Sequence, residues 1–505
     1  MLIKLLMLIV FFGVMIGIGF YCRKSAADVS GFVLGGRSVG PWLTAFAYGT
    51  TYFSAVIFVG YAGQFGWKYG LSATWIGVGN ALIGSMLAWL VLGRRTRIMS
   101  HFLNSSTMPE FFGARFGSRR LKIAASAIVF IFLIPYTASL YNGLSRLFGM
   151  AFHVDYTVCI VMMAVLTGIY VIAGGYMATA MNDFVQGIVM LVGIVTVIAA
   201  VLNTNGGLMA SVHSLSQISD QTAGIKAGAF SSVFGPDPIS LLGVIILTSL
   251  GTWGLPQMVQ KFYAIQSENA IRKGTVISTV FALVISGGCY FLGSFGRLYA
   301  GRINVAKDGY DAIVPQMLSG LSPVLIGLVV ILVLSASMST LSALVMASSS
   351  TLTIDFIREL TDQNMEEKKQ VRIIRILIIV FIVISVILAI VQYKQAITFI
   401  AQLMGVSWGA LAGSFLAPFL YGLYWKRTTK TSIWCCFIFG SGLMICNLLF
   451  RPLFPKLLQS PINAGAFAML AGLIIVPLVS ILTAKPDQKE VDHIFSCYKK
   501  SVQKN

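Results

Sequence analysis

Hydroxyl side chains gather in the middle of a long uncharged stretch. The segment VLSASMSTLSALVMASSSTLTIDF covers residues 333–356 and overlaps the end of the apolar run LIGLVVILVL. Ten Ser and Thr residues stand between Ser335 and Thr353, and the first charged residue is Asp355. Hydroxyl oxygens in such an apolar setting are candidate ligands for a hard cation, because hard cations prefer oxygen.

Three of these positions share one face of a helix. Ala336, Ser339 and Thr340 are spaced i, i+3 and i+4. The Ala336 carbonyl can join the two hydroxyls if they loosen the local backbone hydrogen bonds. Another interpretation stays open, because Ser and Thr in membrane helices also bond back to their own backbone or allow close helix packing.

Two other apolar segments contain residues that interrupt a helix. AYGTTYFSAVIFVGYAGQFG at 47–66 and LTSLGTWGLPQMVQ at 247–260 combine Gly, hydroxyls and, in the second, Pro. Interrupted helices at corresponding positions in two halves of a chain, here about 200 residues apart, are typical of an inverted-repeat transporter. Where such a helix unwinds, its free carbonyls can supply further oxygen ligands.

Only one acidic side chain falls within a predicted membrane span. Of seventeen Asp and Glu residues, that one is Asp183, at the end of its span. An ionisable group there indicates a role with a cation, or it caps the start of a helix at the interface. Ser54, Tyr136 and Trp253 stand in the middle of spans that would line the centre, where aromatic residues also serve for packing.

The composition indicates a polytopic membrane protein. Of its 505 residues, 57% are hydrophobic and 10% are charged, whereas soluble proteins carry about 25% charged residues. The net charge of +19 is interpreted as a topology signal and not as nucleic-acid binding, because Lys and Arg collect in cytoplasmic loops. The seven Cys and four His residues show no metal-binding spacing or disulfide framework, and no cofactor is expected.

Thirteen apolar segments approach the length needed to cross about 30 Å of hydrocarbon. The predicted spans are 3–22, 41–64, 71–93, 121–145, 157–178, 183–202, 239–257, 274–296, 321–349, 373–392, 395–424, 431–450 and 462–483. The basic residues predict an N-terminus outside and a cytoplasmic C-terminus, because the segments that this topology places inside hold most of the 36 Lys and Arg.

These features predict an all-α membrane protein with a single transporter domain, located in the cell membrane. We expect an extra N-terminal helix and loop at 1–40, a first repeat at 41–202, a second repeat at 239–424, two C-terminal helices at 431–483 and a cytoplasmic tail at 484–505. Five spans in each repeat give the two copies opposite orientations in the membrane.

Four motifs, together with the hydroxyl-rich span, resemble the sodium/solute symporter family, which contains sodium–proline, sodium–pantothenate, sodium–sialate and sodium–glucose carriers. The motifs are FVLGGRSVGPWLTA at 32–45, MPEFFGARFGS at 108–118, IAGGYMATAMNDFVQG at 172–187 and LAPFLYGLYWKR at 416–427. The resemblance covers nearly the whole chain. It implies a five-plus-five inverted repeat of the leucine-transporter type, with one extra helix before the repeats and two after them.

The resemblance also implies a sodium site between the second and ninth spans. The ligands carried over by position are the carbonyls of Thr50, Phe53 and Ala336 and the hydroxyls of Ser339 and Thr340. This set includes the helix face found from the spacing alone.

Some members of the family hold a second cation with the help of two serines and an aspartate. Ser342 and Asp183 match that pattern, whereas Ala343 stands where the other serine would be. Ser342 and Asp183 are therefore candidates for a second cation or for coupling.

The nature of the solute is predicted only as a class. IPYTASLYNGLSRLF at 134–148 is most similar to the proline and pantothenate carriers, whereas SLGTWGLPQ at 249–257 departs from the proline type. We expect import of an amino acid or a small carboxylate resembling pantothenate, with a sugar or sialate as the alternative. Solute contacts are expected from Ser54, Tyr136, Trp253 and Gln257.

Two other function classes compete with a symporter. A channel would carry a filter motif or an acidic ring, and a solute sensor would carry a signalling domain. A membrane enzyme would need a His, a metal pair or an activated nucleophile within a span, and no His lies in one. The sequence favours a sodium-driven symporter that alternates access as a monomer, with Na+, a small organic solute and lipid as its partners and no nucleic acid.

Overall fold

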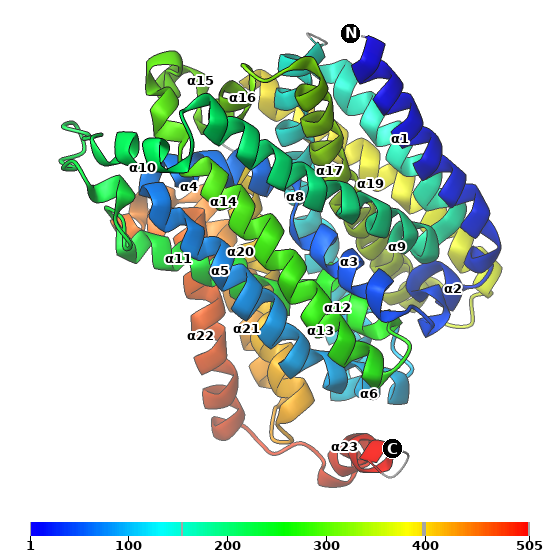
Figure 1. Cartoon of the computed structure of the whole chain (residues 1–505). Helices are drawn as coiled ribbons and strands as arrows, with labels where there is room; N and C mark the ends of the chain where they lie inside the picture. Colours follow the sequence, from blue (N-terminus) through cyan, green and yellow to red (C-terminus); the bar gives the residue numbers. More distant parts are fainter. Residues whose placement is uncertain (1, 153–154, 396–399, 503–505) are drawn as a thin grey trace.

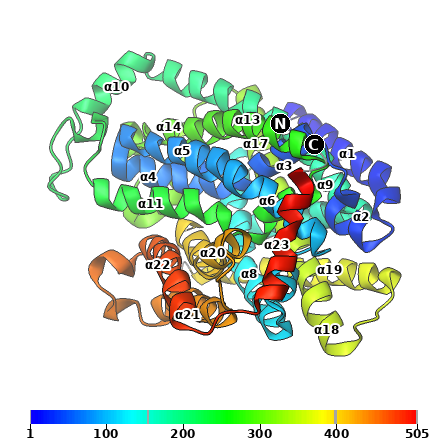
Figure 2. The same cartoon turned by 90° about the horizontal axis from the view of Figure 1, so that it is seen from below.

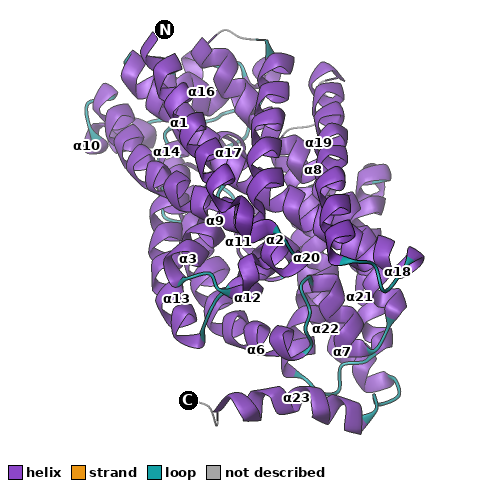
Figure 3. Cartoon of the chain, turned by 90° about the vertical axis from the view of Figure 1, so that its right-hand side faces the viewer, coloured by secondary structure: helices purple, strands orange, loops and turns teal. Residues whose placement is uncertain are grey.

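The protein is built from helices. The computed structural model describes residues 2–152, 155–395 and 400–502, and within them the regular structure is helical (Figures 1 and 3). The all-α class predicted from the sequence is confirmed.

The first half of the chain contains ten α-helices. They are α1 (Leu2–Tyr21), α2 (Val29–Leu34), α3 (Pro41–Tyr52), α4 (Ala62–Tyr69), α5 (Thr74–Gly79), α6 (Arg94–Phe102), α7 (Met108–Phe116), α8 (Arg119–Phe152), α9 (Tyr156–Thr204) and α10 (Leu208–Ser216). A π-helical segment, Val56–Tyr61, leads into α4, and two more, Asn80–Leu87 and Trp89–Gly93, lie between α5 and α6.

The second half continues in the same way. Its helices are α11 (Pro238–Leu250), α12 (Pro256–Ala264), α13 (Glu268–Ala282), α14 (Gly288–Gly293), α15 (Val305–Asp308), α16 (Ile313–Leu318), α17 (Pro323–Thr351), α18 (Arg358–Thr361), α19 (Glu367–Gln395), α20 (Ile400–Tyr424), α21 (Lys430–Leu449), α22 (Pro461–Leu482) and α23 (Gln488–Val502). The π-helical segment Leu283–Gly287 joins α13 to α14, and Leu352–Ile357 joins α17 to α18.

The helical runs account for the expected membrane crossings. In the described residues, 10 runs are long and apolar enough to span a membrane, and the bent pair Pro238–Trp253 and Pro256–Ala264 makes an eleventh. Two of the runs, of 47 and 49 residues, are long enough for two crossings each. Each contains a glycine at positive φ, Gly70 at 61° and Gly175 at 57°, which breaks the helix. Division at these glycines gives the thirteen spans that the sequence predicts.

The two ends of the chain lie at opposite ends of the helical bundle. Figure 1 shows α1 starting at the upper end and α23 lying at the lower end, and Figure 3 shows the same arrangement from the side. An odd number of crossings requires this separation.

Helix α17 is enclosed by protein along most of its length. Every residue from Val329 to Thr351 is buried, and the helix contacts α1, α3, α8, α9 and α19. By contrast, α1 and α19 carry exposed apolar side chains such as Ile9 and Ile387, which suit contact with lipid. The hydroxyl-rich stretch is therefore surrounded by protein.

The last helix, α23, lies across the lower end of the bundle (Figure 2). Tyr498 donates a hydrogen bond to the Leu423 carbonyl at the end of α20 (3.1 Å), and Lys426 pairs with Asp492 (2.6 Å). His493 meets the ring of Phe102 in α6, with ring centroids 5.3 Å apart. One short helix thus contacts segments from both halves of the chain.

Two helices extend beyond the spans predicted for them. The span expected at 239–257 continues in α12 to Ala264, and the span expected at 321–349 continues to Thr361. Both extensions carry charged residues, and the helices continue because those charges are paired inside the protein. The start of the span expected at 395–424 includes 396–399, and the expected tail at 484–505 includes 503–505, both outside the described residues.

Candidate cation and solute site

The first element of the site is a helix that breaks in the middle of the molecule. α3 ends before Phe53, which takes extended backbone angles (φ −103°, ψ 98°). Ser54 Oγ then accepts a hydrogen bond from the Val56 N–H at 3.3 Å, as the next helical segment begins. Because the helix stops here, the carbonyls of Thr50 and Thr51 lose the N–H groups that a continuous helix would offer them.

Two hydroxyls of α17 reach these free carbonyls. Ser339 Oγ lies 3.0 Å from the Thr50 oxygen and 3.2 Å from the Ala336 oxygen. Thr340 Oγ1 lies 3.2 Å from the Thr50 oxygen and 3.3 Å from the Thr51 oxygen. Its distance to the Ala336 oxygen is 3.0 Å. The hydroxyl–carbonyl cluster is the set of these five oxygens: Thr50 O, Thr51 O, Ala336 O, Ser339 Oγ and Thr340 Oγ1.

Such a cluster suits a monovalent hard cation. All five residues are at most 2% exposed, and none carries a formal charge. Divalent cations such as Ca²⁺ are usually bound with the help of carboxylates, whereas uncharged oxygens alone match a single positive charge. Each hydroxyl now donates to a carbonyl, and beside a cation it can rotate and present a lone pair instead.

Four of the five residues expected at the sodium site come together. Thr50, Ala336, Ser339 and Thr340 all belong to the cluster. Phe53 lies at the break itself, and among the described residues no hydrogen bond joins its carbonyl to the cluster. The Thr51 carbonyl is present instead. The sequence could have indicated the Thr51 carbonyl, because Thr51 stands beside Thr50 at the same helix end, where carbonyls lack N–H partners.

Asp183 has a different partner from the one considered in the sequence. Its carboxylate lies 3.9 Å from the Lys261 ammonium, and both side chains are at most 2% exposed. Lys261 lies just beyond the predicted span 239–257, and α12 carries it into the protein interior. Ser342 Oγ donates to the Ser339 carbonyl of its own helix at 2.8 Å.

The residues expected to contact the solute are all buried around the two breaks. Trp253 Nε1 already donates to the Ile83 carbonyl at 3.0 Å, and Ser54 caps a helix. The Tyr136 hydroxyl and Gln257 Oε1 have no hydrogen-bond partner among the described residues. Of the four, Tyr136 and Gln257 therefore have polar atoms available for a solute.

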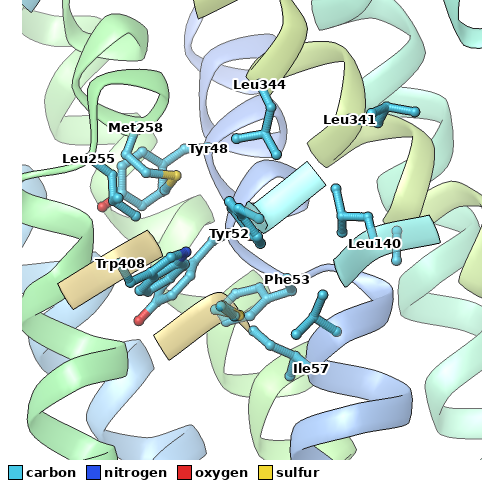
Figure 4. Packing of buried hydrophobic residues seen from close by; sticks show 14 of the residues in the cluster. Tyr48, Tyr52, Phe53, Ile57, Leu140, Leu255, Met258, Leu341, Leu344 and Trp408 are labelled. Carbon is cyan, nitrogen blue, oxygen red and sulfur yellow. The ribbon is translucent and has the colours of Figure 1, made fainter. Parts of the chain in front are cut away.

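An aromatic side chain that the sequence did not indicate lies beside them. Trp408 of α20 stacks on Tyr52 at 6.0 Å between ring centroids and meets Tyr136 edge-on at 5.9 Å. Tyr52 in turn stacks on Phe53 at 4.2 Å. Figure 4 shows Trp408 and Tyr52 side by side, with Leu255 of the second broken helix close to them. Nothing in the local sequence distinguishes Trp408 from a packing residue.

A comparison with known families decides the identity of this arrangement. The family model described as "Sodium:solute symporter family" matches residues 32–440. The chain belongs to the sodium:solute symporter family. It is therefore a multi-pass, sodium-coupled symporter and not an enzyme.

Relatives of the symporter agree over nearly its whole length. The sodium/proline symporter of Staphylococcus aureus strain JH9 is 28% identical over 495 residues, which are 96% of this chain and 93% of the relative. The sodium/proline symporter of strain N315 gives the same figures.

Solved structures show the same fold. A Na+-coupled sialic acid symporter in a substrate-bound outward-open state superimposes with a TM-score of 0.76 at 17% identity, covering 96% of this chain and 99% of that one. The inward-facing conformation of Mhp1 gives a TM-score of 0.52 at 14% identity, covering 90% and 94%. The leucine-transporter type of fold implied by the sequence is confirmed.

The symporter has a polar cavity of about 690 Å³ at the end of the bundle opposite α23. Gln64 and Lys68 line it from α4, and Ser240 and Val244 line it from α11. Asp220, from the loop after α10, contributes a carboxylate, and a hydrogen bond from Thr222 holds the pKa of Asp220 below its usual value. The cavity is thus lined by one half of each broken helix.

At the lower end of the symporter, an ionic cluster surrounds the end of α17. Lys122 Nζ lies 2.9 Å from Glu359, 3.6 Å from Asp355 and 3.7 Å from Glu110. Asp355 is fully buried and also accepts a hydrogen bond from Thr107 at 2.5 Å. We call these groups the Lys122 cluster: Glu110, Lys122, Asp355 and Glu359. Asp355 is thus a second acid inside a helical span, where the sequence indicated Asp183 alone.

Proposed function

We propose that this symporter imports a small organic solute, an amino acid or a small carboxylate, with Na+ bound at the hydroxyl–carbonyl cluster. The observation that carries the proposal is the contact of Ser339 and Thr340 with the free carbonyl of Thr50. These buried oxygens supply ligands for one monovalent cation at the point where a broken helix meets an intact one.

The same contact explains how an ion can drive a solute. An ion held by both α3 and α17 fixes the break in α3 against α17 and so orders the solute site beside it. Binding free energies are reciprocal, so a solute that prefers the ordered arrangement must also raise the affinity for Na+. Four ligands of the ion come from Thr50, Ala336, Ser339 and Thr340. The fifth is the Thr51 carbonyl or, after a small shift at the break, the Phe53 carbonyl.

The solute site in this proposal lies between the two breaks. The free polar atoms of Tyr136 and Gln257 orient the solute, and Trp408 supplies an aromatic wall. Ser54 and Trp253 shape the site through the cap and the hydrogen bond that they already make. The name of the Staphylococcus aureus relatives supports an amino acid as the first solute to test.

The proposed topology places the N-terminus outside and α23 in the cytoplasm, in the cell membrane. The polar cavity is then the outer entrance, and repeats 41–202 and 239–424 alternate access around the breaks. Helix α1 with its loop, 1–40, and the two helices of 431–483 stand outside the repeats, and 484–505 forms the cytoplasmic tail. We propose that a monomer is sufficient, because the cluster and both breaks lie within one chain.

The test is uptake of labelled solutes into proteoliposomes. The panel contains proline, other amino acids, pantothenate, short carboxylates, sialate and sugars, each with and without an inward Na+ gradient. One charge crossing 100 mV yields about 2.3 kcal/mol. A tenfold Na+ gradient adds about 1.4 kcal/mol, so one-to-one coupling permits roughly 500-fold accumulation of a neutral solute.

The outcomes separate the alternatives. Uptake of an amino acid or small carboxylate that requires Na+ and grows with an inside-negative potential supports the proposal. Uptake that ignores Na+ but collapses with the proton gradient contradicts it. Accumulation of a sugar or sialate alone overturns the assigned solute class while leaving sodium coupling intact.

A further inference from the structure

A buried carboxylate and a buried ammonium face each other between two helices. Asp183 lies in the second half of α9, and Lys261 lies in α12, the second half of a broken helix. Lys261 Nζ is 3.9 Å from Asp183 Oδ2, and the two side chains are 2% and 1% exposed. The pair bridges segments that the sequence keeps far apart.

Apart from this ammonium, the carboxylate is poorly satisfied. Among the described residues, neither oxygen of Asp183 accepts a hydrogen bond, and no other cationic group lies within 4 Å. A bare carboxylate is expensive inside a protein, so a positive charge must stay close to it. The ammonium is held by the ring of Tyr176 as well, 5.1 Å from its centroid.

The pair lies close to the second candidate position of the sequence. Ser342 is one turn beyond Ser339 on α17, and α17 packs against α9, the helix that carries Asp183. Tyr170, on the same helix as Asp183, joins the two helices, because its hydroxyl donates a hydrogen bond to the Met338 carbonyl of α17 at 3.0 Å. The Asp183 carboxylate and the hydroxyls of α17 thus belong to two helices that pack together, with the Lys261 ammonium as the cation beside Asp183.

We propose that the Lys261 ammonium is a tethered cation that occupies the position where Asp183 would otherwise hold a second Na+, so that this symporter binds one Na+ per transport cycle. The inference rests on the proposed function, because it takes the hydroxyl–carbonyl cluster as the one exchangeable Na+ site. A tethered charge neutralises Asp183 at every Na+ concentration and contributes nothing to the dependence of uptake on Na+.

The geometry of the pair supports this assignment. A direct hydrogen-bonded ion pair brings nitrogen and oxygen to about 2.7–2.9 Å. The observed 3.9 Å is longer, so the ammonium neutralises the charge of Asp183 without donating a hydrogen bond to its oxygens. Methionine reproduces the lysine stem in length almost to the nitrogen and carries no charge. Lys261→Met therefore leaves the position of Nζ open beside an uncompensated carboxylate.

The test counts ions on the purified full-length protein in lipid nanodiscs, using radiolabelled Na+ and no solute. Wild type is expected to bind one Na+ at saturation, and Lys261→Met two. Lys261→Arg keeps the tethered charge and should bind one. The double variant Lys261→Met/Asp183→Asn removes both charges and should return to one.

Two results would overturn the inference: wild type that binds two ions, or Lys261→Met that still binds one. The proposed function fails separately, if wild type binds no Na+ or if Ser339→Ala/Thr340→Ala leaves its single ion in place. If little folded Lys261→Met protein is recovered, Lys261→Gln is purified once in a Na+ salt and once in a choline salt, and the yields of folded protein are compared. Recovery that improves only in Na+ supports a new Na+ site. Equal recovery in both salts contradicts it.

Discussion

Two segments of α17 carry the same kinds of residue but meet different surroundings. At Ser339 and Thr340, the hydroxyls cross to carbonyls of α3. Two to three turns further on, the Ser348 and Ser349 hydroxyls have no hydrogen-bond partner among the described residues, and the helical run then reaches the Lys122 cluster. A count of hydroxyls does not distinguish these segments.

The difference lies in the neighbouring helix. α3 is broken beside Ser339, so it offers carbonyls without N–H partners. Below the lower segment, the polar contacts are made by charged side chains from the first turns of α7 and α8. Uncharged oxygens suit an ion that must bind and leave, whereas paired charges hold helices together permanently. Loss of the upper contacts should change ion binding, and loss of the lower ones should change stability.

The largest effect is expected at the lower segment. Lys122→Met removes the cation that faces three carboxylates, at 2.9 to 3.7 Å. Breaking a buried ion pair leaves uncompensated charge, and we expect a loss of about 3–5 kcal/mol in the free energy of unfolding. Thermal unfolding of the purified protein measures it. The neighbouring Arg120→Met, at an exposed position, is the matched control. Equal stability of the two variants would show that the cluster does not hold this end together.

The next effect belongs to the upper segment. Ser339→Ala or Thr340→Ala deletes one of five oxygens, which should weaken Na+ binding by about 1.4–3 kcal/mol, or ten- to 150-fold. Sodium titration of solute uptake at matched membrane abundance measures the shift. Solute affinity at low Na+ should fall as well and recover at high Na+, because coupling is reciprocal. If both variants show the same dependence on Na+ as the wild type, the ion binds elsewhere.

A smaller effect is expected where the solute meets the same break. Tyr136→Phe removes a buried hydroxyl that no described residue satisfies. If the solute bonds it, the variant should lose about 0.5–1.5 kcal/mol of solute affinity, or roughly two- to twelvefold. Solute titration at saturating Na+ measures this loss, and the Na+ titration should stay nearly unchanged. A shift in Na+ affinity alone would contradict the division into ion and solute positions.

The smallest effect is expected at the unpaired hydroxyls of the lower segment. Ser349→Ala deletes a hydroxyl without a hydrogen-bond partner, so nothing is left unpaired. We expect stability to change by less than about 0.5 kcal/mol and Na+ affinity by less than about twofold. Both assays used above apply to it without change. An affinity loss like that of Ser339→Ala would erase the distinction between the segments.

The sequence predicts the parts of this site that depend on spacing within one helix. The face of Ala336, Ser339 and Thr340 follows from helical periodicity, and the break near Phe53 follows from the Gly- and hydroxyl-rich span. Both features are local, and the structure contains both.

The parts that the sequence misses depend on which helices become neighbours. Lys261 and Lys122 look like loop residues because one follows an apolar span and the other stands at the start of one, yet both are buried against acids from other helices. The side chain of Trp408 is equally ambiguous until Tyr52 and Tyr136 are seen beside it. Such partners are set by tertiary packing, which no single-helix pattern contains.

The placement of α23 has a consequence for how the protein is made. A ribosome releases the chain from its N-terminus onwards, and spans are inserted in that order. Tyr498 and His493, which contact Leu423 and Phe102, leave the ribosome after every span is already in the membrane. The ends of α6 and α20 thus remain uncovered until α23 has been made. Docking of α23 is therefore an assembly step that follows the synthesis of both helices.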